Sequence, residues 1–142
     1  MSLKLPYKKY PDPEARDGFF YAATIPVNIA LPTENSPRSK RFEAVIDSGA
    51  SQCIFHASIG RAIGLEIEKG KLVTTNSIEG PTEIYMHDIS LYAPGGVIPA
   101  YAGFSDALPI AGLLGMTGFF EYFHITFDPT ALRVELERIY KA

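Results

Sequence analysis

The order of apolar and polar residues predicts a chain built mainly of β-strands. Runs rich in aromatic and β-branched residues recur at short intervals, and glycine, proline or acidic turn residues separate them. The predicted strands are residues 19–31, 42–46, 71–75, 82–92, 97–104, 123–127 and 132–136. Several short strands with turns at short spacing favour a closed, mainly β barrel.

Helical signals are few and local. Ile59 and Ile63 lie four residues apart and Gly64 follows, which predicts one short helix over residues 56–64. The composition of residues 116–122 is compatible with one or two further helical turns. A turn is predicted at Asp128-Pro129-Thr130, so the last two strands should form a hairpin.

The first part of the chain differs in composition from the rest. Pro6, Pro11, Pro13 and Gly18 interrupt a charged stretch, so no helix is expected there. We therefore predict an extended N-terminal arm over residues 1–18 and a single folded domain over residues 19–142.

The composition narrows the class of protein. Of the 142 residues, 46% are hydrophobic and 20% are charged, so the chain is too apolar for a disordered segment. Its 13 Lys and Arg against 16 Asp and Glu give a formal net charge of -3, which argues against a nucleic-acid partner. Prolines and glycines break the longest charge-free run, residues 89–105, so we expect no membrane helix.

Cysteine and histidine usage argues against a metal centre. The lone Cys53 excludes an intramolecular disulfide framework and a cysteine-based zinc cage. Cys53 and His56 could form a thiol nucleophile with its base, but the apolar neighbours of Cys53 favour a buried side chain. His56, His87 and His124 are too scattered for a metal-binding pattern, so no metal and no cofactor are expected. The charged start of the chain has no apolar segment behind it, and together with the single cysteine this predicts a cytoplasmic location.

The candidate chemistry lies at the end of the predicted strand 42–46, where Asp47-Ser48-Gly49-Ala50 follows. An isolated Asp-Ser-Gly triplet is most often a turn. Here it closes an apolar strand, so the Asp47 carboxyl would lie on a short loop at the edge of the core, where its surroundings can tune its reactivity. The small residues Gly49 and Ala50 leave room for another backbone or a substrate to approach closely.

Two motifs, in this order, resemble the retropepsin-like aspartic proteases, including their small cellular single-domain members. The first is the apolar run into Asp47-Ser48-Gly49-Ala50, and the second is Ile110-Ala111-Gly112-Leu113-Leu114-Gly115. The resemblance covers about residues 19–136, and between the motifs it rests on the strand pattern. Many relatives carry a charged or amide residue after the last glycine of the second motif, whereas Met116 follows here.

The resemblance implies a retropepsin-like closed barrel, with one lobe of the acid-protease fold per chain and one or two short helices. It implies an aspartic-type endopeptidase that hydrolyses peptide bonds with a water activated by a pair of Asp carboxylates. Asp47 would then be the shared acid and base, and Ser48 and Gly49 would brace its loop. The supporting segment that packs against this loop would be Leu113, Leu114 and Gly115.

The resemblance also implies a flap that excludes water and holds the peptide extended. The segment 75–81 lies between two predicted strands, and Ile78, Glu79 and Gly80 would contact the substrate from it, with Ala50 contacting the substrate from the catalytic loop. The substrate would add as a β-strand between flap and floor. An ordinary hairpin loop is the alternative interpretation of this segment.

The number of motifs bears on assembly. Two carboxyls are needed for this chemistry, and the chain has one Asp-Ser-Gly, so a second copy must supply the other. We therefore expect a homodimer with a peptide or protein substrate, and edge strands at residues 19–29 and 132–139 that pair with the second chain. The alternatives are a retropepsin-like dimerisation or peptide-binding module with little or no hydrolytic activity, and a small barrel that binds an unrelated ligand.

Overall fold

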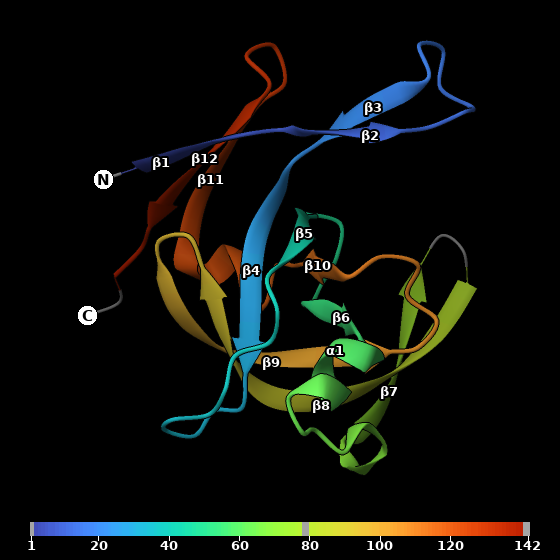
Figure 1. Cartoon of the computed structure of the whole chain (residues 1–142), viewed down its shortest axis with the longest axis vertical. Helices are drawn as coiled ribbons and strands as arrows, with labels where there is room; N and C mark the ends of the chain where they lie inside the picture. Colours follow the sequence, from blue (N-terminus) through green and yellow to red (C-terminus); the bar gives the residue numbers. More distant parts are fainter. Residues whose placement is uncertain (1, 78–79, 141–142) are drawn as a thin grey trace.

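The computed structural model describes residues 2–77 and 80–140, and its fold is mainly β (Figure 1). The strands are β1 (Ser2–Pro6), β2 (Lys8–Pro11), β3 (Phe19–Ala22), β4 (Thr24–Ala30), β5 (Phe42–Ile46), β6 (Ile54–His56), β7 (Lys71–Ser77), β8 (Gly80–Ala93), β9 (Gly96–Ser105), β10 (Gly112–Leu114), β11 (Phe123–Asp128) and β12 (Arg133–Arg138). The helical elements are α1 (Ala57–Ala62) and the 3₁₀ turns η1 (Ile67–Lys69) and η2 (Phe120–Tyr122). Within the described ranges, no helix is long and apolar enough to cross a membrane.

A 7-stranded sheet forms the body of the molecule, in the order β4-β5-β10-β6-β9-β8-β7. An additional antiparallel pairing of β4 with β8, from Asn28↔Tyr92 to Ala30↔Ser90, closes all of these strands except β7 into a ring. Among the described residues β7 pairs only with β8, and the two strands form a hairpin that projects from the ring (Figure 1). The predicted mainly β, closed-barrel fold is therefore confirmed.

The inside of the ring is filled by apolar side chains from every second position of its strands. Ile25, Val27 and Ile29 of β4 are all buried, as period-two alternation requires. Phe55 of β6 and Phe104 of β9 are fully buried, with ring centroids 5.9 Å apart. Burial of such a side chain contributes roughly 1.5–3 kcal/mol, so this core is the main force that keeps the ring closed.

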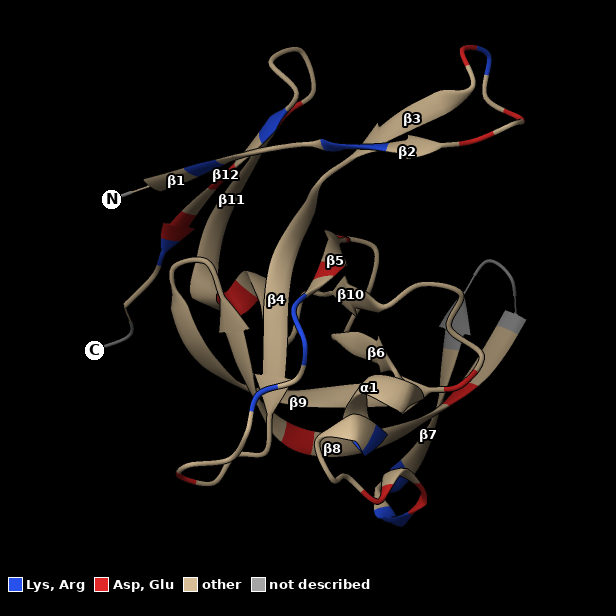
Figure 2. Cartoon of the chain, in the orientation of Figure 1, with Lys and Arg blue, Asp and Glu red and all other residues tan. Residues whose placement is uncertain are grey.

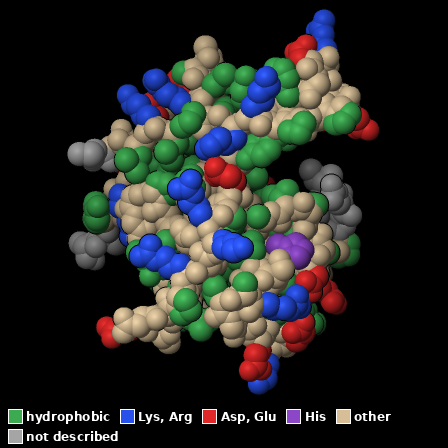
Figure 3. Space-filling model, in the orientation of Figure 1, with side chains coloured by type: hydrophobic (Ala, Val, Ile, Leu, Met, Phe, Trp, Pro, Cys, Tyr) green, Lys and Arg blue, Asp and Glu red, His purple; other side chains and the backbone are tan. Residues whose placement is uncertain are grey.

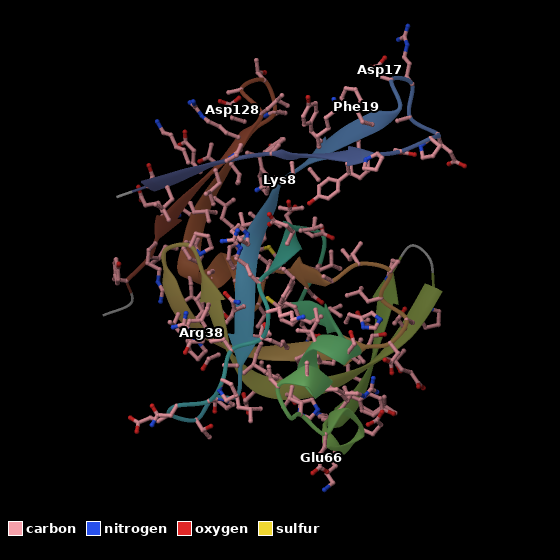
Figure 4. All side chains as sticks on the ribbon, viewed as in Figure 1. Lys8, Asp17, Phe19, Arg38, Glu66 and Asp128 are labelled. Atoms are coloured by element: carbon pink, nitrogen blue, oxygen red, sulfur yellow. The ribbon has the colours of Figure 1, made fainter. Side chains whose placement is uncertain are left out.

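Strands from the two ends of the chain form a second, smaller sheet. β12 lies between β1 and β11 in a 3-stranded antiparallel sheet. After β1 the chain enters the β2–β3 hairpin, which projects from the body, with Asp17 near its tip (Figures 1 and 4). The prediction of an open edge at residues 132–139 is wrong, because β12 is paired on both edges. In the stretch 19–29, β3 pairs with β2, while residues 24–27 of β4 pair with β5 and residues 28–30 with β8, so no described residue of this stretch has strand partners on both sides, and its pairing with a second chain stays a prediction.

Most elements agree with the sequence-based expectations. The predicted strand 42–46 coincides with β5, and the predicted helix 56–64 contains α1, which begins after His56. The His56 ring caps α1, since its Nδ1 accepts a hydrogen bond from the Ser58 N–H at 3.1 Å. Residues 116–122 form one 3₁₀ turn, η2. The predicted strand 19–31 is divided into β3 and β4 at Ala23, where the chain leaves the hairpin for the ring.

Candidate active site

Asp47 lies where β5 ends. Its backbone N–H donates to the Leu114 carbonyl oxygen (3.0 Å), so the sheet register is maintained up to this residue. Its Oδ1 accepts a hydrogen bond from the Gly49 N–H at 2.8 Å, and its carbonyl oxygen accepts one from the Ala50 N–H at 3.1 Å. These two bonds close a tight turn. The half-buried carboxylate is therefore fixed through Oδ1, while Oδ2 has no hydrogen bond to any described residue.

The short strand β10 brings the two sequence motifs together. It pairs in parallel with β5 (Leu113↔Val45, Leu114↔Ile46) and antiparallel with β6. Beyond β10, the Met116 N–H donates to the Ala50 carbonyl oxygen at 2.9 Å, and the chain continues beside the same loop. Residues 47–50, the Asp47 loop, are thus held by backbone hydrogen bonds from a segment far away in the sequence.

Gly115 is required by the close approach of these two segments. A Cβ atom at this position would lie 2.6 Å from the Gln52 carbonyl carbon and 2.7 Å from the Ala50 carbonyl oxygen. Both are backbone atoms, which cannot move aside as a flexible side chain can. The glycine therefore permits the contact between the second motif and the Asp47 loop.

Ser48 and Ala50 have different surroundings. Ala50 is half-buried, and its carbonyl oxygen is the acceptor for Met116. The Ser48 side chain is exposed and forms no hydrogen bond with any described residue of the chain. A bracing bond from the Ser48 hydroxyl is thus not made within the described part of one chain, and its role stays a prediction.

The predicted flap corresponds to the β7–β8 hairpin. The two strands are paired from Lys71↔Met86 to Ser77↔Gly80, so Gly80 is the first residue of β8. Ile78 and Glu79 lie outside the described residues. The hairpin stands at one side of the body, as a long pair of strands (Figure 1).

Asp106, Glu68 and Asp128 are carboxylates outside this loop that already have structural partners. Arg61 donates to Asp106 Oδ1 at 2.7 Å and to Glu68 Oε1 at 2.8 Å, and these hydrogen bonds lower the pKa of both carboxyls. The pair with Asp106 connects α1 to the start of the segment that leads into β10. Asp128 Oδ1 accepts a hydrogen bond from the Ala131 N–H at 3.0 Å within its turn. No spacing in the sequence indicates the Arg61 network, because its members come from separate elements.

The alternative thiol site is not formed. Burial raises the pKa of the Cys53 thiol to about 11, and the thiol donates weakly to the Thr117 carbonyl oxygen at 3.6 Å. The His56 Nδ1 lies 2.7 Å from the Ser58 hydroxyl instead of pairing with Cys53. A thiol of this kind is a poor nucleophile near neutral pH. In the part of the chain that the structure describes, no three His, Cys, Asp or Glu side chains form a metal-binding group.

The Asp47 loop lines neither of two grooves on the surface of the single chain. One groove, of about 390 Å³, lies at the base of the β7–β8 hairpin and is lined by Ile67 with residues 81–83, Tyr85 and residues 104–107. The second, of about 310 Å³, lies between β4 and the turn joining β8 to β9. Neither includes any of residues 47–50. A peptide bound at Asp47 would therefore need a further wall.

Comparisons with known proteins give the fold. No protein-family model and no curated protein matches the sequence. Among solved structures, a retropepsin-like aspartic protease from Rickettsia conorii aligns over 96% of this chain and 98% of its own, with a TM-score of 0.63 and 16% sequence identity. The EIAV protease in complex with an inhibitor aligns over 66% of this chain and 81% of its own, with a TM-score of 0.49 and 16% identity. The chain thus has the retropepsin-like fold.

Proposed function

We propose that this chain is an aspartic endopeptidase whose catalytic centre is a pair of Asp47 carboxyls from two copies of the chain. The observation that carries the proposal is the position of Asp47 in the fold and the hydrogen bonds that fix its carboxylate and its loop. It follows β5 directly, its Oδ1 is held by the Gly49 N–H, and its loop is bonded to the segment after β10. A carboxyl fixed in this way is preorganised, which is what acid and base catalysis requires. The shared fold with the Rickettsia conorii protease supports the assignment.

The chemistry follows from two carboxyls that share one proton. Two such groups a few ångströms apart do not both ionise, so one is a carboxylate and the other an acid. The carboxylate takes a proton from water as the water oxygen bonds to the scissile carbonyl carbon, and the acid protonates the carbonyl oxygen. Collapse of the tetrahedral gem-diol then breaks the C–N bond: one of its hydroxyls returns a proton to the carboxylate of the dyad while the protonated carboxyl gives its proton to the leaving amine, so the dyad again holds one proton.

A homodimer supplies what one chain lacks. Three other Asp side chains are already engaged: Asp106 in an ion pair with Arg61, and Asp12 and Asp128 as acceptors of backbone N–H groups close by in the sequence. The Asp47 loop lines neither the groove at the base of the β7–β8 hairpin nor the groove between β4 and the β8–β9 turn. A two-fold axis beside Asp47 would supply the second carboxyl and the second wall together.

The decisive experiment is a test of cleavage against protein concentration. A mixture of unstructured peptides is incubated with the protein, and the products are identified by mass spectrometry. We expect cleavage that a statine-type inhibitor blocks, and a specific activity that falls as dilution separates the dimer. Cleavage that stays constant per chain while sedimentation shows monomers would overturn the shared dyad. No cleavage by a sedimentation-verified dimer would favour a peptide-binding module.

The rate should peak at acidic pH. The dyad is competent when its two carboxyls hold one proton between them, so the rate falls when the second proton binds or the last one leaves. Hydrogen bonds from Arg61 lower the pKa of Asp106 and of Glu68 in the folded chain. These two carboxylates therefore stabilise the fold at any pH above their unfolded-state pKa, and that stabilisation is lost as the pH falls through their lowered folded-state pKa. The network should therefore survive in mildly acidic buffer. A pH profile of kcat/KM that rises into alkaline buffer would contradict the mechanism.

Replacing Ser48 by Ala should weaken the dimer. The Ser48 hydroxyl is exposed in the single chain, so in the proposed dimer it can bond across the interface. Loss of one such hydrogen bond costs about 1 kcal/mol, which is about a fivefold rise in the dimer Kd. Sedimentation equilibrium measures this, and Ser51→Ala, another exposed serine after the same turn, is the matched control. Equal dimer Kd values for wild type and Ser48→Ala would remove the bracing role.

A further inference from the structure

A groove of about 310 Å³ on the outside of the ring carries two arginines. It is lined by Pro26 and Asn28 of β4, by Arg38 and Arg41 of the connection to β5, and by residues 92–94, 96 and 97 around the β8–β9 turn. Arg38 lies beside the β8–β9 hairpin (Figure 4). Lys and Arg residues also occur along the connection that leads into β5 (Figure 2). We call this surface the basic groove.

The wall that bears the arginines is a fixed part of the fold. Ser39 lies between them, and its backbone N–H donates to the Ile29 carbonyl oxygen at 2.8 Å, while the Ile29 N–H donates to Ser39 Oγ at 3.0 Å. The Asn28 side-chain amide donates to the Ser39 carbonyl oxygen at 2.9 Å. These bonds attach the connection to β4 as an additional strand would. Residues 38 and 41 therefore keep their places at the groove.

The charge of the basic groove is uncompensated. The Arg38 guanidinium stacks over the Tyr92 ring, with 3.9 Å between its central carbon and the ring centroid. Arg38, Lys40 and Arg41 take part in none of the ion pairs among the described residues, which use Lys8, Arg61, Lys69 and Arg133. None of the residues that line the groove is acidic. Figure 3 shows Lys and Arg side chains gathered over the middle of this face.

We propose that the basic groove binds an acidic segment of a polypeptide. Guanidinium groups bind carboxylates through paired, charge-assisted hydrogen bonds, and stacking on Tyr92 presents the edge of Arg38 to a ligand. The volume suits one or two carboxylate side chains. Single-stranded nucleic acid needs an open aromatic face for its bases, and Arg38 already covers the face of Tyr92.

The basic groove and the Asp47 loop lie at opposite ends of the same strand. Arg41 directly precedes β5 and Asp47 directly follows it. An extended strand rises about 3.3 Å per residue, so roughly 20 Å separates the two positions. If the proposed endopeptidase function holds, on which this step rests, the preferred substrates carry acidic residues at least about six positions from the cleaved bond.

Fluorescence polarisation tests binding directly. The probes are dye-labelled hexaglutamate and hexaglutamine, and the protein is the full chain, both wild type and Asp47→Asn. We expect hexaglutamate to bind and hexaglutamine not to bind. The double variant Arg38→Gln/Arg41→Gln should raise the hexaglutamate Kd at least about tenfold, since hydrogen bonds to charged groups are lost. The hexaglutamate Kd of the charge-conserving variant Arg38→Lys/Arg41→Lys should lie between those of wild type and of the glutamine variant, because lysine keeps the charge but lacks the planar guanidinium that bonds a carboxylate through two N–H groups.

The matched control removes the same charge elsewhere. Arg16 and Lys71 are exposed cations on the β2–β3 hairpin and on β7, so Arg16→Gln/Lys71→Gln should change the Kd less than about twofold. Equal weakening by both double variants would overturn the proposal, since it would reflect net charge alone. So would binding of an eight-nucleotide RNA or of tripolyphosphate without binding of hexaglutamate.

The outcomes also separate this proposal from the proposed function. Binding of hexaglutamate through Arg38 and Arg41 by a protein that cleaves no peptide supports the basic groove and removes the endopeptidase. Cleavage of neutral peptides by a protein that does not bind hexaglutamate supports the endopeptidase and removes the basic groove as a binding site. If both hold, a substrate with a distal acidic segment should have a higher kcat/KM than its glutamine counterpart, and Arg38→Gln/Arg41→Gln should abolish that difference without slowing the neutral substrate.

Discussion

Asp47→Asn should abolish peptide hydrolysis and leave the fold unchanged. The substitution keeps the shape of the side chain and keeps an Oδ1 that can accept the Gly49 N–H, which is 2.8 Å away. It removes the shared proton and the carboxylate that takes a proton from water. General acid and base catalysis contributes about 10²–10⁴-fold per group, so a loss of at least about 10³-fold in kcat is expected when both are lost.

The measurement is initial cleavage rate at saturating peptide, with circular dichroism melting as the check on the fold. Asp88→Asn is the matched control, because Asp88 is an exposed carboxylate on β8, outside the Asp47 loop. A mixture of wild type with excess Asp47→Asn should also lose activity, since mixed dimers hold one carboxyl. Wild-type rates in Asp47→Asn would refute the assignment of the catalytic centre.

Gly115→Ala should strongly destabilise the fold. The new Cβ would overlap the Gln52 carbonyl group and the Ala50 carbonyl oxygen, both of them backbone. Either β10 or the Asp47 loop would have to shift. Overpacking of this kind costs about 3 kcal/mol, which for a domain of this size lowers the Tm by roughly 10 °C.

Gly64→Ala separates this clash from the general cost of replacing glycine. Gly64 has a φ of +96° and an open surrounding, so alanine there is strained but meets no atom within 4 Å. We expect a loss of about 1 kcal/mol, measured by urea unfolding beside Gly115→Ala. If the two variants lose the same stability, the close approach at Gly115 is not what holds the loop.

The sequence predicted those features that local patterns encode. β5 was predicted over its full length, because an apolar run stops at a turn-forming triplet. The three-residue strands β6 and β10 are too short for any periodicity to emerge, so only the resemblance indicated the role of Leu113 and Leu114. Alternation in residues 132–136 identified a strand, but alternation does not specify neighbours, and β1 covers the edge that was expected to be open.

The arm and the basic groove show the same limit. Prolines in residues 1–18 argue against a helix, but Pro6 and Pro11 end β1 and β2, where a missing N–H costs little. Arg38, Lys40 and Arg41 are visible in the sequence as a cluster of cations in a loop. The groove itself needs Tyr92 from a distant strand, on which Arg38 stacks, and this contact arises from closure of the ring.

The position of β10 between β5 and β6 has a consequence for how the chain reaches its native state. β5 ends at Ile46 and β6 begins at Ile54, yet they do not pair, because a strand that starts at Gly112 separates them. Until that strand arrives, both neighbours present unpaired edges. Loop-closure entropy makes such a non-local insertion slow, and exposed edges favour association of unfinished chains. During synthesis the ring remains open until most of the chain has left the ribosome, so the Asp47 loop acquires its final geometry among the last steps of folding.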